Sequence, residues 1–189
     1  MEPVLTLSSG ISLKVLRAHD AGTLYTLINR NREHLREWLP WVDASRDPRD
    51  TRRFLEKSYA SHLRGGGFSF GIRRRGELSG VIGFHGFDGA NRVTSLGYWL
   101  ALDACGQGVM RACVQACVSY AFRDRGMNRL YVRCATKNQR SRRVPETLGF
   151  VHEGTQREAE WLYDHFVDLE VYSVLAAEWE GRQSGKAVL

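Results

Sequence analysis

The chain has 189 residues, of which 43% are hydrophobic and 25% are charged. These values are typical of a water-soluble globular protein, and the length suffices for one domain with a sizeable core. No apolar stretch is long enough to cross a bilayer, and the start Met1-Glu2-Pro3 lacks the pattern of a signal peptide. We therefore expect one cytoplasmic domain over residues 1–180, no membrane contact, and a flexible tail over residues 181–189.

The formal net charge of +6 favours an acidic partner. A phosphorylated cofactor, a nucleic acid or an acidic protein would satisfy it equally. The four cysteines, Cys105, Cys113, Cys117 and Cys134, form no CxxC pair, and no histidine cluster has metal-ligand spacing. We interpret them as packed, reduced thiols and expect no metal site.

The first third of the chain predicts a strand followed by two helices. Residues 11–16 alternate as a short strand, and residues 19–31 have the periodicity of a helix. A second helix should begin at Asp47-Pro48, because Asp is a favoured N-cap and Pro a favoured first residue. It should end at the three glycines 65–67.

The rest of the chain predicts three strands, a helix, a strand, a helix and a final hairpin. The strands are 68–73, 78–84 and 93–100, followed by a helix over 107–125, a strand over 130–135, a helix over 138–147, and hairpin strands over 150–161 and 166–176. The order βααβββαβαββ predicts a mixed α/β domain built on one sheet.

A glycine-containing loop, Cys105-Gly106-Gln107-Gly108-Val109-Met110, connects the strand at 93–100 to the following helix. Helix N-termini carry unpaired N–H groups and a partial positive charge, and glycines let a phosphate approach the backbone closely. The loop lacks the Gly-Lys-Ser/Thr ending of a P-loop, and Arg111 stands where a dinucleotide fingerprint has a third glycine or alanine. The loop is a candidate phosphate cradle, and a tight turn into a packed helix is the alternative.

Several separated motifs accompany this loop in order. They are Asn31-Arg32-Glu33-His34-Leu35, Trp38-Leu39-Pro40-Trp41, Leu96-Gly97-Tyr98-Trp99-Leu100, Asn128-Arg129-Leu130, Cys134-Ala135-Thr136, Asn138 with Ser141, Leu148-Gly149-Phe150 and Glu158-Ala159-Glu160-Trp161-Leu162. With them the chain resembles the GCN5-related N-acetyltransferase (GNAT) superfamily over residues 11–180, and within it the RimL-type branch of ribosomal-protein-serine acetyltransferases. The resemblance implies the GNAT fold, in which helices flank a single mixed, mostly antiparallel sheet.

The resemblance also implies acetyl-CoA as acetyl donor and direct attack of a neutral amine on its thioester. It assigns the pyrophosphate to the loop and the helix start, the thioester carbonyl to a backbone N–H at the end of the preceding strand, and the pantetheine arm to Asn138. The loop departs from the family at Cys105, where Gln or Arg is usual, and this would weaken cofactor binding. The implied cofactor-binding residues are Trp99, Leu100, Ala101, Cys105, Gly106, Gln107, Gly108, Val109, Met110, Arg111, Ala112, Asn138 and Arg143.

By the same resemblance, Glu160 is the general base and Ser141 assists the departing sulfur. Strand periodicity would place Glu158 and Glu160 on one face, and two solvated carboxylates are the alternative. Asn138 and Ser141 could instead cap the helix that contains them. Arg143, together with its basic neighbours, would hold the 3′-phosphate or an acidic acceptor, and a solvated helix face is the alternative.

Two tryptophans and one histidine have more than one interpretation. Trp38 and Trp41 would wall its site, because the N-terminal helices do so in this superfamily, or they would simply pack in the core. His85 follows a strand and is interpreted as a packed or surface histidine rather than a catalyst.

The function predicted from these features is an acetyl-CoA-dependent N-acetyltransferase that acts on the N-terminal α-amino group of a ribosomal-protein-like acceptor. A small-molecule amine is the alternative acceptor. A non-catalytic module of the same fold that binds the ribosome or RNA is the alternative of another class. The family suggests a homodimer, and for the enzyme nucleic acid is not expected as a partner.

Overall fold

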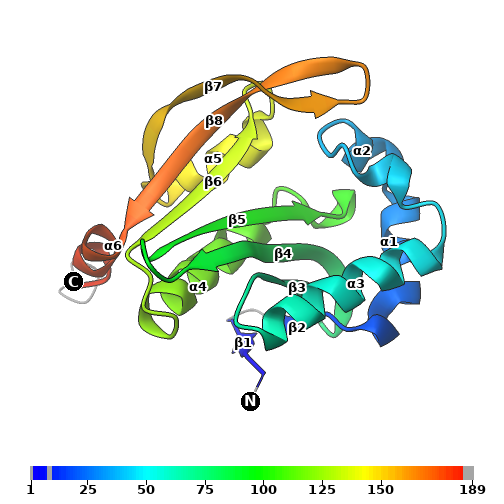
Figure 1. Cartoon of the computed structure of the whole chain (residues 1–189), viewed down its shortest axis with the longest axis horizontal. Coiled ribbons are helices and arrows are strands. Elements are labelled where there is room, and N and C mark those ends of the chain that lie inside the picture. Colours follow the sequence, from blue (N-terminus) through cyan, green and yellow to red (C-terminus); the bar gives the residue numbers. More distant parts are fainter. Residues whose placement is uncertain (1, 8–9, 185–189) are drawn as a thin grey trace.

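The computed structural model describes residues 2–7 and 10–184, which form one eight-stranded sheet flanked by helices (Figure 1). The strand order is β1-β2-β3-β4-β5-β6-β8-β7, in which β5 and β6 are parallel and every other pair is antiparallel. The predicted mixed, mostly antiparallel sheet is confirmed. The strands are β1 Val4–Thr6, β2 Ile11–Val15, β3 Phe68–Arg74, β4 Glu77–Asp88, β5 Val93–Leu100, β6 Arg129–Ala135, β7 Val151–Leu162 and β8 His165–Leu175.

Helices cover both faces of the sheet (Figure 1). On one face, α1 and α3 bury Leu24 and Leu55 against Val81 of the sheet and Leu16, which follows β2. On the other face, α4 packs into the larger apolar cluster. The helices are α1 Ala21–Arg30, α2 Arg32–Arg36, α3 Pro48–Leu63, α4 Val109–Arg123, α5 Gln139–Thr147 and α6 Ala176–Ser184. Among the described residues, no helix is long and apolar enough to span a membrane.

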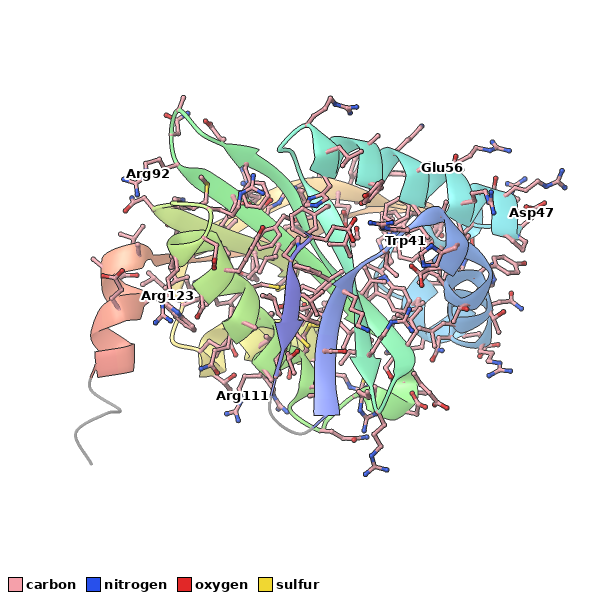
Figure 2. The ribbon with its side chains drawn as sticks, turned by 90° about the horizontal axis from the view of Figure 1, so that it is seen from below. Trp41, Asp47, Glu56, Arg92, Arg111 and Arg123 are labelled. Atoms are coloured by element: carbon pink, nitrogen blue, oxygen red, sulfur yellow. The ribbon has the colours of Figure 1, made fainter. Side chains whose placement is uncertain are left out.

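Two local predictions from side-chain chemistry are confirmed. Asp47 caps α3 by accepting a hydrogen bond from the N–H of Arg49, and Asp50 reaches back to the backbone of Asp47. Figure 2 shows Asp47 at the outer end of that helix. The turn between β3 and β4 is made by Arg75 and Gly76, which both have positive φ.

The structure also differs from the predicted order. It adds the strand β1, the short helix α2 and the C-terminal helix α6. The composition of residues 181–189 predicts a flexible tail, but α6 continues to Ser184, and residues 185–189 lie outside the described residues. Along α4, Val114 and Val118 are fully buried beside Cys113 and Cys117.

The sheet opens in its middle, and this opening positions the site. β5 and β6 are paired only between Val93–Leu96 and Arg129–Val132. Beyond Leu96, β5 remains paired with β4, while β6 remains paired with β8. The two strands therefore separate before β5 reaches the glycine loop, as Figure 1 shows.

Candidate active site

The glycine loop lies directly before α4, as its sequence predicts. Gly106 and Gly108 both have a φ of 74°, in the left-handed region, and a Cβ atom at either position would meet nothing within 4 Å. Gly108 is the N-cap of α4, a helix of 15 residues. The glycines are thus required by conformation rather than by close packing.

The loop presents a series of backbone donors. The first N–H groups of a helix have no intrahelical acceptor, and in α4 the N–H of Ala112 is the one that bonds to the carbonyl of Gly108, at 3.1 Å. The N–H of Ala112 is therefore occupied, and the predicted set of donors ends at Arg111. The side chain of Gln107 stabilises the loop, because its Nε2 donates a hydrogen bond to the carbonyl of Asp103 at 2.7 Å.

A cleft of about 900 Å³ opens in front of these donors. Its walls come from α2 and the segment after it, from the end of β5 with the glycine loop, and from the first turns of α5. Four basic side chains, Arg111, Lys137, Arg140 and Arg143, line it against one acidic side chain, Glu37. The excess of positive charge suits a ligand that carries several phosphates.

The end of β5 offers fewer donors than predicted. The N–H of Ala101 donates to the carbonyl of Ser79 at 2.9 Å, and Ala101 does not line the cleft. Along a strand the N–H groups alternate in direction, so the N–H of Trp99 also points toward β4 and that of Leu100 toward the opening. Leu100 is therefore the residue of this predicted set whose N–H can reach a ligand carbonyl.

The first turn of α5 carries Asn138 and Ser141 into the cleft. The side-chain oxygen of Asn138 accepts a hydrogen bond from the N–H of Ser141 at 3.1 Å, so Asn138 is the N-cap and Ser141 is not. The hydroxyl of Tyr98 donates to the carbonyl of Ser141 at 3.2 Å, which ties α5 to β5. Burial raises the pKa of the neighbouring Cys134 thiol to about 11, although a hydrogen bond with Ser141 acts in the opposite direction.

The two arginines that follow Ser141 have different surroundings. Arg142 bonds to the hydroxyl of Tyr172 and to the carbonyl of Thr136, at 3.1 and 2.9 Å, and it holds α5 to the sheet. Arg143 is exposed and lines the cleft, as the prediction requires. Sequence reasoning did not separate the two, because their roles depend on contacts with β8.

Glu160 lies on β7 beyond a large irregularity. Between Gln156 and Glu160 the strand contains two more residues than β8 opposite it, and Glu158 has a φ of 49°. The simple alternation that would place Glu158 and Glu160 on one face is therefore interrupted: Glu158 is exposed, whereas Glu160 is half-buried. Burial raises the pKa of Glu160, opposed by the charge of Arg133. Glu160 does not line the cleft of the glycine loop.

On the acceptor side, the two predicted tryptophans are joined by a tyrosine that the sequence did not single out. Trp38 lines the cleft, while Trp41 packs on Trp99 with ring centroids 6.2 Å apart. The turn of the β7–β8 hairpin reaches this segment, because the hydroxyl of Tyr163 donates to the carbonyl of Leu39 at 2.6 Å. Tyr163 and Leu39 are far apart in the chain, so no pattern in the sequence near either residue indicates this contact.

A family model described as an acetyltransferase (GNAT) domain matches residues 11–151. The chain belongs to the GNAT family. Its membership confirms the predicted enzyme class, an acyltransferase, and acetyl-CoA as the acetyl donor of that class.

Individual GNAT proteins are similar over nearly the whole chain. YdaF of Bacillus subtilis (strain 168), provisionally named a ribosomal N-acetyltransferase, is 32% identical over 177 residues, which cover 92% of this chain and 95% of that protein. The ribosomal-protein-serine acetyltransferase of Escherichia coli (strain K12) is 29% identical over 173 residues, with coverage of 92% and 97%. A solved structure of RimL, a ribosomal L7/L12 alpha-N-protein acetyltransferase in complex with coenzyme A, has a TM-score of 0.88 and 25% identity, and covers 92% of this chain and 98% of that one.

The residues present fit the acetyl donor of a GNAT enzyme. The two positive-φ glycines leave space above the loop, the N–H groups of the first turn of α4 lack intrahelical partners, and the cleft is positively charged. Cys105, the departure from the family pattern, is half-buried and directs its Sγ toward the carbonyl of Ala101 at 3.4 Å. Its side chain thus turns back to the protein, and the backbone donors remain.

Proposed function

We propose that this GNAT enzyme acetylates the N-terminal α-amino group of a protein, with a ribosomal-protein-like acceptor. The observation that carries the proposal is the positively charged cleft of about 900 Å³ between the glycine loop and the first turns of α5. Two relatives similar over nine-tenths of the chain are named for ribosomal or ribosomal-protein acetylation. The net charge of +6 supports an acidic segment in the acceptor.

The acceptor side supports an extended substrate rather than a small amine. A second hollow, of about 550 Å³, lies between α2 and the turn of the β7–β8 hairpin. It shares Glu37 with the cleft, so the two hollows adjoin. A peptide could enter along them with its N-terminus directed toward the thioester, whereas a small amine would leave the second hollow unused.

In this proposal each part of acetyl-CoA has its own partner in the chain. The backbone N–H groups from Gly106 to Arg111 hold the pyrophosphate, and the side-chain amide of Asn138, which lines the cleft, bonds the pantetheine arm. The N–H of Leu100 donates to the thioester carbonyl as negative charge develops on it. Ser141 donates a hydrogen bond to the departing sulfur, and Glu160 accepts the proton that the nitrogen loses during the attack.

The test is acetylation of defined acceptors. The protein is incubated with acetyl-CoA and peptides that carry acidic or basic residues after a free N-terminus, and the products are located by fragmentation mass spectrometry. We expect acetylation at the α-amino group and a preference for the acidic peptides. A panel with blocked α-amino groups and free lysines, and a panel of small amines, are the comparisons. Transfer to small amines alone, or no transfer at all, would overturn the proposal.

Glu160→Gln tests the proposed base. General-base catalysis typically contributes a factor of about 10² to 10⁴, so kcat should fall at least about 100-fold while the Kd of acetyl-CoA stays unchanged. The matched control is Glu158→Gln, because Glu158 lies two residues away and is exposed. Equal losses in both variants would show that Glu160 acts only through the local structure.

We also propose that the enzyme works in the cytoplasm as a homodimer. The four cysteines are free, which agrees with a reducing compartment. Sedimentation at several protein concentrations would measure the oligomeric state, and a monomer at the concentrations used for activity would overturn that part of the proposal.

A further inference from the structure

Glu37 lies where the two hollows of the site meet. It lines both the cleft of the glycine loop and the second hollow beside the β7–β8 hairpin, and it is the residue that the two have in common. The N–H of Leu102 donates to the side-chain oxygen of Asn31 at 2.9 Å, directly before α2, and Trp41 packs on Trp99. The segment that carries Glu37 is therefore fixed at both ends to the end of β5 and the residues that follow it.

The β7–β8 hairpin contacts the same segment on either side of Glu37, as the position of α2 near the hairpin turn shows (Figure 1). The guanidinium of Arg36 lies over the ring of Tyr163, 4.0 Å from its centroid, and the hydroxyl of Tyr163 donates to the carbonyl of Leu39 at 2.6 Å. These contacts fix the backbone around Glu37, whereas its side chain is exposed. A ligand that extends from one hollow into the other therefore passes Glu37.

The charge of Glu37 is available to such a ligand. In the second hollow, the carboxylate of Asp43 accepts hydrogen bonds from Nε of Arg36 at 3.0 and 3.1 Å, and Asp164 lies 2.7 Å from Nδ1 of His165. Glu37 has no hydrogen-bond or ion-pair partner among residues 2–7 and 10–184. Of the described residues that line the cleft, it is also the one acidic side chain, opposite four basic ones.

The acceptor amine reaches this cleft as a cation. A free α-amino group has a pKa of about 7.7–8.0, so at neutral pH most of it is protonated. The basic side chains of the cleft repel this charge, and a carboxylate where the two hollows meet offsets the repulsion. Trp38, the next residue, also lines the cleft, and the face of an indole ring attracts an ammonium group.

We propose that Glu37 binds the protonated α-amino group of the acceptor as it passes from the second hollow toward the thioester, an inference that rests on the proposed function. The carboxylate accepts a hydrogen bond from the ammonium nitrogen, and the ring of Trp38 lies beside it. Glu37 acts in binding, while the transfer itself is carried by the groups named above. It thereby selects a free N-terminus over a blocked one.

The variant Glu37→Gln tests this role by calorimetry, with coenzyme A in place of acetyl-CoA so that no transfer occurs. Two peptides of the same acidic sequence are compared, one with a free and one with an acetylated N-terminus. At pH 7 the variant should bind the free peptide about tenfold more weakly, the effect of one charge-assisted hydrogen bond, and the acetylated peptide as the wild type does. At about pH 9.5 the amine is neutral and the difference should vanish. An equal loss with both peptides, or no loss, would overturn the inference.

Glu33→Gln is the matched control, because Glu33 lies one turn earlier in α2, is exposed and lines neither hollow. It should bind both peptides as the wild type does. A third peptide, acetylated at its N-terminus and with lysine as its second residue, carries the same charge on a side chain. If Glu37→Gln weakened the binding of this peptide alone, the assignment to the α-amino group would be overturned. A wild-type protein that acetylates no peptide would instead refute the proposed function.

Discussion

The two sides of the active site are built in different ways. The donor side consists of consecutive backbone, from the end of β5 through the glycine loop into α4, and its geometry depends on positive φ at Gly106 and Gly108. The acceptor side is assembled from α2, the segment that follows it and the β7–β8 hairpin, which meet through side chains. Changes on the donor side should therefore alter the binding of acetyl-CoA, and changes on the acceptor side should alter the use of the peptide.

Gly108→Ala should produce the largest effect of this comparison. An alanine in the left-handed region costs about 1–2 kcal/mol, so the free protein would relax the loop and turn its N–H groups away. Binding must then restore the strained loop, and the affinity for acetyl-CoA should fall about tenfold, as isothermal calorimetry would measure. Peptide acetylation at saturating acetyl-CoA should keep its kcat.

Gly126→Ala is the matched control, because Gly126 has a φ of 63° and open space around it, beyond the opposite end of α4. It should lose a similar amount of thermal stability and none of its affinity for acetyl-CoA. If both variants lost affinity equally, the strain would act through the whole fold and not through the loop.

The difference between the donor side and the acceptor side also explains which features could be predicted from the sequence. The position of the glycine loop before a helix, the start of α3 at Asp47 and the turn at Arg75-Gly76 follow from local chemistry, and all three are confirmed. The predicted donors at Ala101 and Ala112 are occupied, because strand pairing and helix bonding decide the direction of an N–H.

On the acceptor side the missing information is long-range. Strand alternation fails to describe the surroundings of Glu160, because β7 contains extra residues before it that no turn motif marks. His85 is predicted to lie just after a strand, but β4 continues to Asp88, and the position of its ring depends on a bulge and on a glycine of the next strand. These features depend on pairing between strands, which residue patterns within one segment do not report.

Tyr163→Phe should have an intermediate effect, confined to the acceptor. It removes the hydrogen bond to the carbonyl of Leu39 and loosens the contact between the hairpin turn and the segment that carries Trp38. A net hydrogen bond is worth about 0.5–1.5 kcal/mol, so KM for the peptide should rise about threefold to tenfold while the Kd of acetyl-CoA is unchanged.

The control for Tyr163→Phe is Tyr25→Phe, which removes a similar bond, from a tyrosine hydroxyl to the carbonyl of Arg46 at 2.8 Å, away from both hollows. Steady-state kinetics with varied peptide would measure the difference. A rise in the Kd of acetyl-CoA in the Tyr163 variant would contradict the separation of the two sides.

Cys105→Ser should have the smallest effect, although Cys105 is the departure from the family pattern in the loop. Its Sγ is directed toward the carbonyl of Ala101, so the pyrophosphate donors are backbone groups that serine leaves in place. We expect the Kd of acetyl-CoA to change by less than about threefold, the size of one weak hydrogen bond. A tenfold loss would show that the thiol itself contacts the donor.

Alkylation of the wild-type protein gives an independent check on the position of this thiol. Desolvation raises the pKa of Cys105, and only the thiolate is nucleophilic, so modification should be slow at pH 7 and still increase above pH 9. Acetyl-CoA should protect it, because Cys105 lines the cleft. Cys113, which is fully buried and whose pKa is raised to about 12, should stay unmodified with or without acetyl-CoA. Protection at Cys105 without a loss of affinity in Cys105→Ser would establish that the side chain lies beside the donor and does not hold it.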